Sequence, residues 1–253
     1  MSLIRRLLMP DRLPSVPAGI CVYAIGDIHG RADLLTAMMT MIRSDIETRR
    51  VRRPVIVFLG DYIDRGPQSS DVIDQLIAIE QSDAMESHFL MGNHEEVLLR
   101  VLRGDKRLFC DWLRFGGREC LASYGLDGDA LAKLGSMEIV TRMKEAIPRR
   151  HRQFLGELAD TVRVGDYLFV HAGLRPDLAL EAQSQQDLRW IRSPFLEDEA
   201  ADHGYMVVHG HSMRSEVDRR ANRIGIDTGA YHSGRLTALV LDGVTQTFLQ
   251  TEP

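Results

Sequence analysis

The sequence predicts an α/β protein with mixed β-sheets, in which two sheets are expected to pack face to face. In the first hundred residues, short apolar runs alternate with segments whose apolar residues recur at helical spacing. In the second half, two hairpin patterns appear, each with a Gly-Asp or Asp-Gly turn between alternating strands. Parallel β-α-β units followed by hairpins therefore predict mixed sheets.

Three strands are expected in the first half, and each is a short run that ends at a glycine. They cover residues 20–25, 55–59 and 88–91. Apolar residues recur at helical spacing over residues 34–46, after the first strand. Ser69 and Ser70 cap a second helix, and a third helix follows Gly92. This β-α-β-α-β order implies parallel strands joined by crossover helices.

The second half begins with a mainly helical stretch, residues 104–160, punctuated by Gly116-Gly117 and Pro148. The two hairpins are TVRV-GD-YLFV and LTALVLDGVTQTFL. Between them, the apolar run MVV leads into His209. These strands, added to the three of the first half, are enough to form two sheets.

The composition excludes several classes of protein. With 44% hydrophobic and 26% charged residues, the 253-residue chain can bury a sizeable core. Its net charge of -5 argues against a dedicated nucleic-acid binder, so no stable nucleic-acid partner is expected. Charge and proline interrupt the apolar run near the N-terminus, so neither a signal peptide nor a membrane span is predicted. Three widely spaced cysteines favour the free thiols of a cytoplasmic protein.

Polar residues follow five of the predicted strands directly, each beside a glycine. The five segments are Gly26-Asp27-Ile28-His29, Gly60-Asp61, Gly92-Asn93-His94, His171-Ala172-Gly173 and His209-Gly210-His211. Ligands of open α/β sheets bind at the carboxyl ends of the strands. One such turn is usually structural, but five together would bury many polar groups without partners. Carboxylate, imidazole and amide oxygen without thiolate suit divalent manganese, iron or zinc.

These segments resemble the motifs of the phosphoprotein phosphatase family of calcineurin-like metallophosphoesterases, which run GDxHG, GDxxDRG, GNHE, HAG and GH[ST]. All five motifs occur in order over residues 26–212. The stretches around residues 116–125, 188–196 and 222–241 are similar to the bacterial branch of that family. The resemblance implies a single metallophosphoesterase catalytic domain over residues 19–253, with the calcineurin-like fold, in which two mixed β-sheets pack as a sandwich flanked by helices (α-β-β-α). Residues 1–18 are an N-terminal extension that reads as an unanchored terminus.

The resemblance also implies a role for each matching residue. Two divalent metal ions are expected, with Asp27 and His29 on the first and Asp61 bridging both. The second ion is completed by Asn93, His171 and His211. The implied mechanism is direct attack on phosphorus by a metal-bridging water or hydroxide, at ions ~3.5–4 Å apart.

Four further residues are expected to act on the substrate. His94 protonates the leaving oxygen, and Asp64 orients His94 and stabilises its charged form. Arg65 grips the phosphate, and Arg192 matches a second phosphate-binding arginine of the bacterial members. Each arginine has an ordinary structural alternative, as a brace of its loop or as a surface residue.

The substrate favoured by this resemblance is a phosphorylated protein or peptide, so a serine/threonine protein phosphatase is the leading interpretation. A symmetrical dinucleoside-polyphosphate hydrolase is the alternative, because the same motifs serve both reactions. A non-catalytic module that binds phosphorylated ligands is disfavoured, because every expected metal ligand and His94 are intact.

Three features stay open. His209 is either close to the metal site or structural, and Asp227 is either a partner of a metal-bound histidine or a turn residue. The basic stretch 103–118 contains Trp112 and Phe115 and either contacts substrate or forms an ordinary solvated helix face. The sequence does not indicate an oligomeric state.

Overall fold

The structure, a computed structural model, describes residues 13–252 and contains two five-stranded sheets. The first sheet has the order β10 (Thr245–Gln250), β9 (Thr237–Asp242), β1 (Ile20–Ile25), β2 (Arg53–Phe58) and β3 (Glu86–Phe89). β1, β2 and β3 are parallel, as the β-α-β pattern predicts, and β9 runs antiparallel to both β1 and β10. The C-terminal hairpin thus completes the sheet that the N-terminal strands begin.

The second sheet has the order β4 (Thr161–Val164), β5 (Tyr167–Val170), β6 (Met206–His209), β8 (Arg223–Gly225) and β7 (Asp218–Arg219). Its three central strands are parallel, and β4 and β7 are antiparallel edges. Val22 and Val57 of the first sheet share one buried cluster with Phe169 and Val208 of the second. The sheets therefore pack face to face, which confirms the predicted sandwich.

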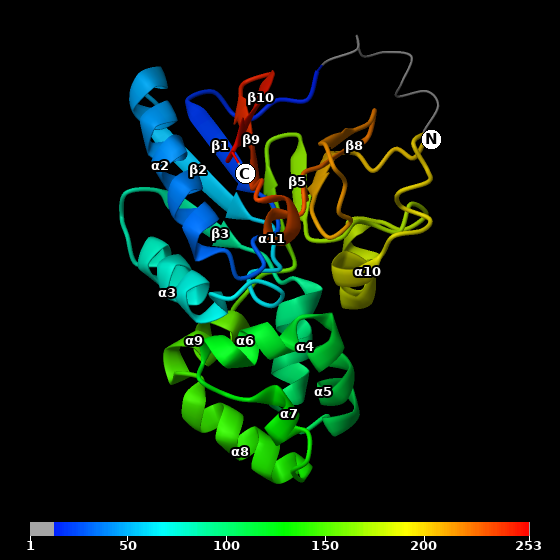
Figure 1. The fold of residues 1–253 in the computed structure, drawn as a ribbon. Coiled ribbons are helices and arrows are strands. Elements are labelled where there is room, and N and C mark those ends of the chain that lie inside the picture. Colours follow the sequence, from blue (N-terminus) through cyan, green and yellow to red (C-terminus); the bar gives the residue numbers. More distant parts are fainter. Residues whose placement is uncertain (1–12, 253) are drawn as a thin grey trace.

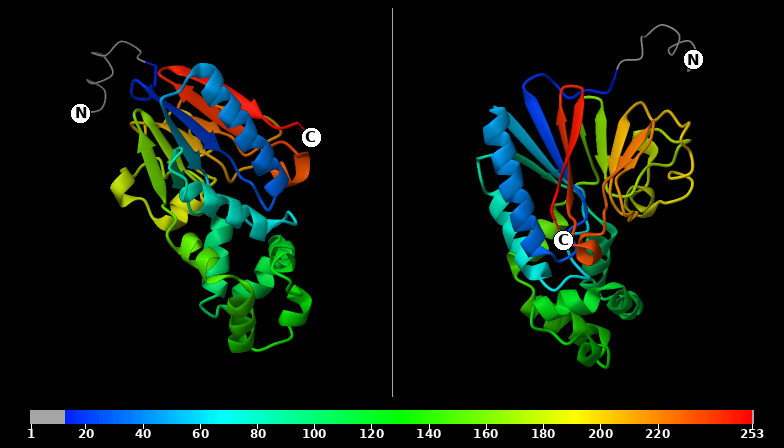
Figure 2. Two further views of the ribbon diagram at one scale, coloured as in Figure 1. Left: turned by 90° about the vertical axis from the view of Figure 1, so that its left-hand side faces the viewer. Right: turned by 45° about the horizontal axis from the view of Figure 1, so that its top comes forward.

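Helices cover the outer faces of both sheets (Figures 1 and 2). Helices α2 (Ala32–Arg49) and α3 (Ser69–Glu80) connect the parallel strands and bury one stripe each against the first sheet. On the second sheet, the η2 turn (Leu180–Ala182) and helix α10 (Gln185–Trp190) surround a smaller cluster that includes Leu168, Leu188 and Phe195. The α-β-β-α prediction is therefore confirmed, with a thin helical layer on the second side.

A helical insert lies between the two sheets in sequence and at one end of them in space (Figure 1). It comprises α4 (Asn93–Val101), α5 (Lys106–Trp112), the η1 turn (Leu113–Phe115), α6 (Gly117–Ser123), α7 (Gly128–Leu131), α8 (Ser136–Ala146) and α9 (Arg149–Gly156). The buried cluster on the outer face of the first sheet continues into it through Phe109, Cys120 and Phe154. A final short helix, α11 (Ala230–Ser233), precedes β9.

The expectation of an unanchored N-terminus is wrong for residues 14–17. The backbone N–H of Val16 donates to the Gly243 carbonyl, and the Tyr167 hydroxyl donates to the Pro14 carbonyl. The Ser15 N–H and hydroxyl both donate to Asp166, at 2.9 and 3.1 Å. These contacts join the segment to both hairpins, which the sequence pattern of a terminus does not reveal. Residues 1–12 of the predicted extension lie outside the described part of the chain.

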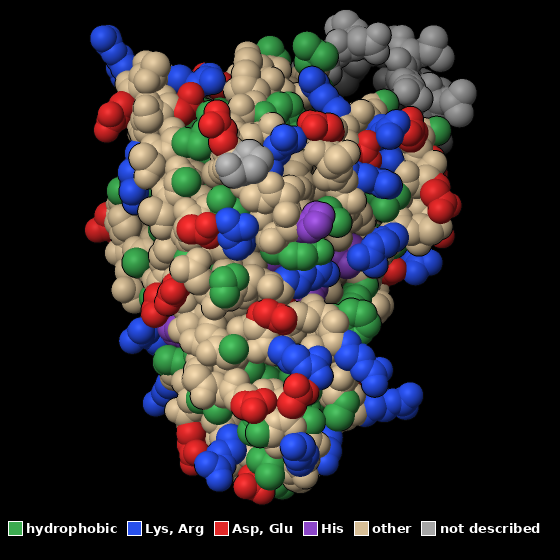
Figure 3. All heavy atoms as spheres, viewed as in Figure 1, with side chains coloured by type: hydrophobic (Ala, Val, Ile, Leu, Met, Phe, Trp, Pro, Cys, Tyr) green, Lys and Arg blue, Asp and Glu red, His purple; other side chains and the backbone are tan. Residues whose placement is uncertain are grey.

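The carboxyl ends of β1, β2, β3, β5 and β6 all face the region where the sheets meet the helical insert (Figure 1). On the face shown in Figure 3, this region is hollowed, and histidine side chains reach the surface there with Lys and Arg side chains beside them. Of the helices that the structure describes, none combines the length and the apolar character that a membrane span requires.

Candidate metal centre and active site

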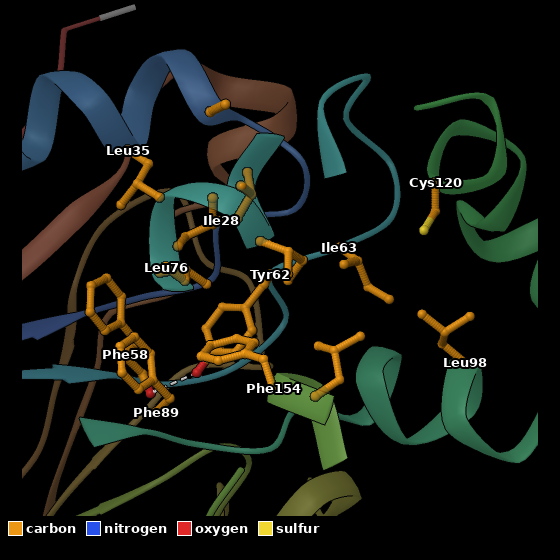
Figure 4. Packing of buried hydrophobic residues seen from close by; sticks show 14 of the residues in the cluster. Ile28, Leu35, Phe58, Tyr62, Ile63, Leu76, Phe89, Leu98, Cys120 and Phe154 are labelled. Atoms are coloured by element: carbon orange, nitrogen blue, oxygen red, sulfur yellow. Dashed lines mark hydrogen bonds between the residues drawn. The ribbon is translucent and has the colours of Figure 1, made fainter. Parts of the chain in front are cut away.

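The loops after β1 and β2 alternate polar residues with fully buried apolar ones. Ile28 lies between Asp27 and His29, and Tyr62 and Ile63 lie between Asp61 and Asp64. The three apolar side chains point into the core beneath the loops, among residues of α2, α3 and the insert (Figure 4). The Tyr62 hydroxyl also donates to the Leu90 carbonyl at 2.7 Å. The core thus anchors each loop, which leaves its polar residues facing the opposite way.

The backbone is unusual at these positions. Among the described residues, those other than glycine with positive φ are His29, Arg50, Asp61, Asp64, Arg65 and His211. Such conformations cost free energy in residues with a Cβ and persist where the surrounding structure imposes them. All but Arg50 belong to the predicted site, so the strain is concentrated where the chemistry is expected.

The structure brings the six predicted metal ligands into one buried cluster. Each of them, Asp27, His29, Asp61, Asn93, His171 and His211, has at most 7% of its surface exposed. Two groups of three residues place ligand atoms within 4.8 Å of one another. One is His29, Asp61 and His94, and the other is Asp61, His171 and His211. Asp61 is common to both groups and lies at the centre of the cluster.

Two histidines are locked by backbone carbonyls so that each directs Nε2 at Asp61. His29 Nδ1 donates to the Ile63 carbonyl at 2.9 Å, and His171 Nδ1 donates to the Leu59 carbonyl at 2.8 Å. Their Nε2 atoms lie 3.6 Å from Asp61 Oδ2 and 3.4 Å from Asp61 Oδ1, respectively. In the neutral tautomer that these bonds select, lone pairs face a carboxylate on both sides. These Nε2 lone pairs and the Asp61 oxygens repel one another unless cations lie between them.

Asn93 adds an acceptor oxygen beside the second group, and His211 of that group has a nitrogen without a hydrogen-bond partner. Asn93 Oδ1 lies 3.0 Å from His171 Nε2 and 2.8 Å from His211 Nδ1. His211 Nε2 is buried and has no hydrogen-bond partner among the described residues. Burial and the nearby His171 lower the pKa of His211 to about 3, so the imidazole is neutral near pH 7. Neutral imidazole, carboxylate and amide oxygen together fit a divalent cation.

Asp27 is held at the edge of the cluster, outside both groups. Its carboxylate accepts the backbone N–H of His211 at 3.0 Å. A Cβ at Gly210 would lie 2.0 Å from Asp27 Oδ1, so only glycine lets the two strand ends approach this closely. Burial, followed by the charges of Asp227 and Asp61, raises the pKa of Asp27. A bound divalent cation would offset this repulsion between carboxylates.

His94 and Asp64 form a buried pair beside the cluster. His94 Nδ1 donates to Asp64 Oδ2 at 2.5 Å, and its Nε2 lies 3.9 Å from Asp61 Oδ2. Burial opposes the charged imidazole, but Asp61 and Asp64 outweigh it and raise the pKa of His94 to about 9. The pair therefore favours an imidazolium whose free nitrogen faces the cluster.

The two predicted arginines differ in their relation to the site. Arg65 Nη2 lies 3.3 Å from His94 Nε2, and the Arg65 guanidinium sits over the Tyr231 ring, 4.8 Å from its centroid. Arg192 is exposed just after α10, and its positive charge helps to lower the pKa of His211. Arg65 therefore contacts the site directly, whereas Arg192 is linked to it through its charge.

A family model described as calcineurin-like phosphoesterase matches residues 21–227, which is most of the chain. The chain belongs to the calcineurin-like phosphoesterase family. With its two buried His/Asp groups it is a metal-dependent phosphoesterase, and the predicted enzyme class and family resemblance are confirmed.

The relatives of this phosphoesterase given below are two nucleotide tetraphosphatases and one protein phosphatase. An asymmetrical bis(5'-nucleosyl)-tetraphosphatase of Anoxybacillus flavithermus is 27% identical, over 85% of this chain and 88% of its own. A symmetrical bis(5'-nucleosyl)-tetraphosphatase of Methylococcus capsulatus is 26% identical, over 90% and 94%. Serine/threonine-protein phosphatase 2 of Escherichia coli is 25% identical, over 85% and 90%.

A solved structure, provisionally named as a diadenosine tetraphosphatase, shares the fold with a TM-score of 0.62. It is 18% identical and covers 96% of both chains. This likeness supports the architecture of the phosphoesterase domain.

Several residues around the site carry roles that sequence reasoning did not assign. The buried Glu95 carboxylate accepts backbone N–H groups of Asp61, Tyr62, Ile63 and Gly92. A glutamate three residues after the N-cap is the acidic half of a capping box, and this spacing signals the bond from the Gly92 N–H but not those from the Asp61 loop. Tyr231 and Trp112 reach Arg65 and Asp64 from distant parts of the chain, and no local pattern marks them.

The open residues can now be placed. Asp227 Oδ1 accepts the N–H of Gly229 at 2.9 Å, which is a turn contact and not a bond to a histidine. His209 packs edge-on against Phe195, with ring centroids 5.1 Å apart, and burial lowers its pKa to about 4. Trp112 is buried, whereas Phe115 is 65% exposed, so only Phe115 of this aromatic pair is available to a ligand.

Proposed function

We propose that this phosphoesterase hydrolyses dinucleoside polyphosphates, cutting one phosphoanhydride bond with water. The observation that carries the phosphoesterase chemistry is the position of Asp61, which lies beside the candidate ligand His29 in one buried group and beside the candidate ligands His171 and His211 in the other. One carboxylate shared by two cation positions places both charges next to a single phosphoryl centre.

In this proposal Asp27, His29, Asp61, Asn93, His171 and His211 hold two divalent ions, and manganese is the ion to test first. When bound, the ions would lower the pKa of water and neutralise phosphate charge. The chain's own part is to hold these ligands rigid. Backbone carbonyls fix the rings of His29 and His171, and the Glu95 carboxylate fixes the backbone of Asp61. These contacts hold the ligands in place before substrate binds.

His94 is the proposed general acid. As water forms its bond to phosphorus, the bond to the leaving oxygen breaks, and that oxygen takes the proton of His94 Nε2. Asp64 accepts from Nδ1 and so keeps the other nitrogen directed at the reacting centre. The raised pKa of His94, about 9, favours the protonated form at neutral pH.

Arg65 and Arg192 are the proposed phosphate ligands. The Arg65 guanidinium packs over the Tyr231 ring, and its Nη2 lies 3.3 Å from His94 Nε2, so two cationic donors lie side by side at the cluster. The positive charge of Arg192 also acts on His211. Guanidinium groups suit a phosphoryl centre that gains negative charge in the transition state.

The substrate class is supported by the relatives and by one exposed ring. Both tetraphosphatases named above match nearly the whole of their own length. Phe115 is 65% exposed, and the carbonyl of the adjacent Gly116 accepts the backbone N–H of Arg65 at 3.2 Å. Arg114 is also exposed on this turn. An aromatic ring and a cation so close to Arg65 suit a nucleobase and the outer phosphates of a dinucleotide.

Phosphoprotein hydrolysis is the second candidate, because the Escherichia coli phosphatase matches over a similar share of the chain. The two candidates separate in one assay. Metal-free protein is restored with manganese, and turnover of diadenosine tetraphosphate is compared with turnover of a phosphoserine peptide. Faster release of nucleotides supports the proposal, with two ADP marking a symmetrical cut and ATP plus AMP an asymmetrical one. Faster release of inorganic phosphate from the peptide overturns it in favour of the phosphatase.

Phe115→Ala gives a sharper test of the nucleobase contact. Because the side chain is mostly exposed, its loss leaves the fold intact. We expect a rise of about 5- to 150-fold in KM for the dinucleotide, since stacking on a base is worth ~1–3 kcal/mol and 1.4 kcal/mol is a factor of ten. Turnover of p-nitrophenyl phosphate, which has no base, stays unchanged. Met137→Ala on α8 removes another exposed apolar side chain of the insert and serves as the control.

A further inference from the structure

Trp112 contacts the Asp64–His94 pair from the helical insert. The indole Nε1–H donates to Asp64 Oδ2 at 2.7 Å, and this is the same oxygen that accepts His94 Nδ1. Trp112 and Asp64 are both buried. The insert is therefore joined to the proposed acid through a single carboxylate oxygen, shielded from water.

The carboxylate of Asp64 needs these donors. It is fully buried, and burial raises its pKa, whereas the bonds from His94 and Trp112 lower it. When His94 gives up its proton, it becomes a weaker donor, and the indole bond then remains to hold the carboxylate. Indole is a donor only and cannot turn to accept, so it holds Asp64 Oδ2 on the line of its N–H bond.

The indole itself has little freedom. A Cβ at Gly117 would lie 2.5 Å from the Trp112 ring, so glycine at the start of α6 leaves room for the ring. Phe109 of the same helix also packs against it, with ring centroids 6.2 Å apart. A buried donor with close neighbours is suited to orienting a carboxylate.

We propose that Trp112 is a positioning residue for His94: through Asp64 Oδ2 it holds the imidazole at the angle from which Nε2 reaches the leaving oxygen. The inference rests on the proposed function of His94 as general acid. It also gives the helical insert a part in catalysis, because α5 supplies the outermost member of a Trp112–Asp64–His94 chain.

The first test is spectroscopic and needs no activity. The chain has two tryptophans, so the indole region of a ¹⁵N–¹H spectrum contains two signals. Trp112→Phe assigns one of them, and Asp64→Ala is expected to move that signal upfield while the Trp190 signal stays in place. An unmoved Trp112 signal overturns the proposal. If Trp112→Phe does not fold, Trp190→Phe makes the same assignment.

The second test compares leaving groups. Phenyl phosphate has a poor leaving group and p-nitrophenyl phosphate a better one, so loss of acid catalysis slows the first more. We expect Trp112→Phe to lower kcat for phenyl phosphate about tenfold, with KM unchanged and p-nitrophenyl phosphate affected less than about twofold. Trp190→Phe removes an equivalent indole bond, to Glu96 at 3.0 Å, and should leave the ratio of the two rates as in the parent.

His94→Asn separates the two levels of the argument. If His94→Asn shows the leaving-group dependence and Trp112→Phe slows both substrates equally, the role of Trp112 is wrong and that of His94 stands. If His94→Asn itself shows no dependence, the general-acid assignment is wrong, and the proposal for Trp112 falls with it.

Discussion

The side-chain carboxylate of Glu95 accepts the backbone N–H of Asp61 at 2.9 Å, in the interior of the protein. The same carboxylate accepts the N–H groups of Tyr62, Ile63 and Gly92. Its two oxygens therefore fix the loop that carries the shared carboxylate Asp61 onto the first turn of α4, where Asn93 and His94 begin. Burial and the charge of Asp61 raise the pKa of Glu95 to about 7, against the four donors that favour its ionised form.

Glu95→Gln is predicted to loosen the metal centre without touching any candidate ligand. A glutamine amide has one acceptor oxygen, so its NH₂ group would face backbone N–H donors. We expect manganese affinity and kcat to fall by about 10- to 100-fold, the usual range for residues that orient metal ligands. Calorimetric titration of the metal-free protein measures the affinity directly.

Glu96→Gln is the matched control for this change. Glu96 is the next residue on α4, and its carboxylate accepts from Trp190, away from the Asp61 loop. Manganese affinity should be close to that of the parent in this variant. Equal losses in the two variants would mean that α4 is simply destabilised, and would contradict the specific role of Glu95.

Tyr231→Ala is predicted to weaken phosphate binding through Arg65. The ring lies beneath the Arg65 guanidinium and also contacts His29 edge-on, with centroids 5.4 Å apart. A cation–π contact of this kind is worth about 1 kcal/mol, so the inhibition constant of inorganic phosphate should rise roughly fivefold. Tyr231→Phe keeps the ring and should bind phosphate as the parent does. A loss of similar size with phenylalanine would assign the effect to the hydroxyl instead.

Asp61→Asn is predicted to abolish both activity and stabilisation by metal. Asp61 belongs to both candidate groups, so its negative charge attracts a cation at either position, and its loss weakens both. We expect manganese to raise the melting temperature of the parent, as any ligand of the folded state does, and to leave that of Asp61→Asn unchanged. Asp187→Asn changes a buried carboxylate that lies outside both groups and accepts from Arg175, so this variant should keep the response to manganese.

The sequence was sufficient for the sandwich and for the identity of the clustered residues, because both depend on local patterns. Strand runs that end at Gly-Asp, Gly-Asn or His identify the loops without reference to anything distant. The parallel order then brings the carboxyl ends together by topology alone. Asp61 and His171 therefore lie in contact, as the motif pattern implied, although 110 residues separate them.

Contacts made by residues outside the motifs could not be predicted in this way. Trp112 and Asp64 are 48 positions apart, and their hydrogen bond depends on how the insert docks beneath the loops. Tyr231 reaches Arg65 because Arg31 donates to the Ala230 carbonyl at 3.1 Å and ties α11 to the first loop. In our proposal substrate choice also depends on such a residue, because the position of the exposed Phe115 beside the Arg65 loop is set by the fold of the insert and not by a local pattern.

A hydrogen-bond network joins the insert to α3, and it is predicted to stabilise the protein less in acid. Asp74 on α3 accepts from Arg150 at 2.6 Å and from the buried His151 at 2.9 Å, and the Tyr124 hydroxyl lies 3.0 Å from the other nitrogen of His151. Burial opposes ionisation of Asp74, but these donors outweigh it and lower its pKa.

A carboxyl whose pKa is lower in the folded state contributes stability above its ordinary pKa of 3.8, and this stability is lost as the pH falls through the lowered value. Asp74→Asn should therefore lower the melting temperature at pH 6 to 7, and its difference from the parent should shrink as the pH falls below 3.8. The measurement is a series of thermal melts of both proteins across this range, with Asp83→Asn, an exposed turn residue, as control. A difference between parent and variant that stays constant with pH would show that the ionised carboxylate is not what holds α9 to α3.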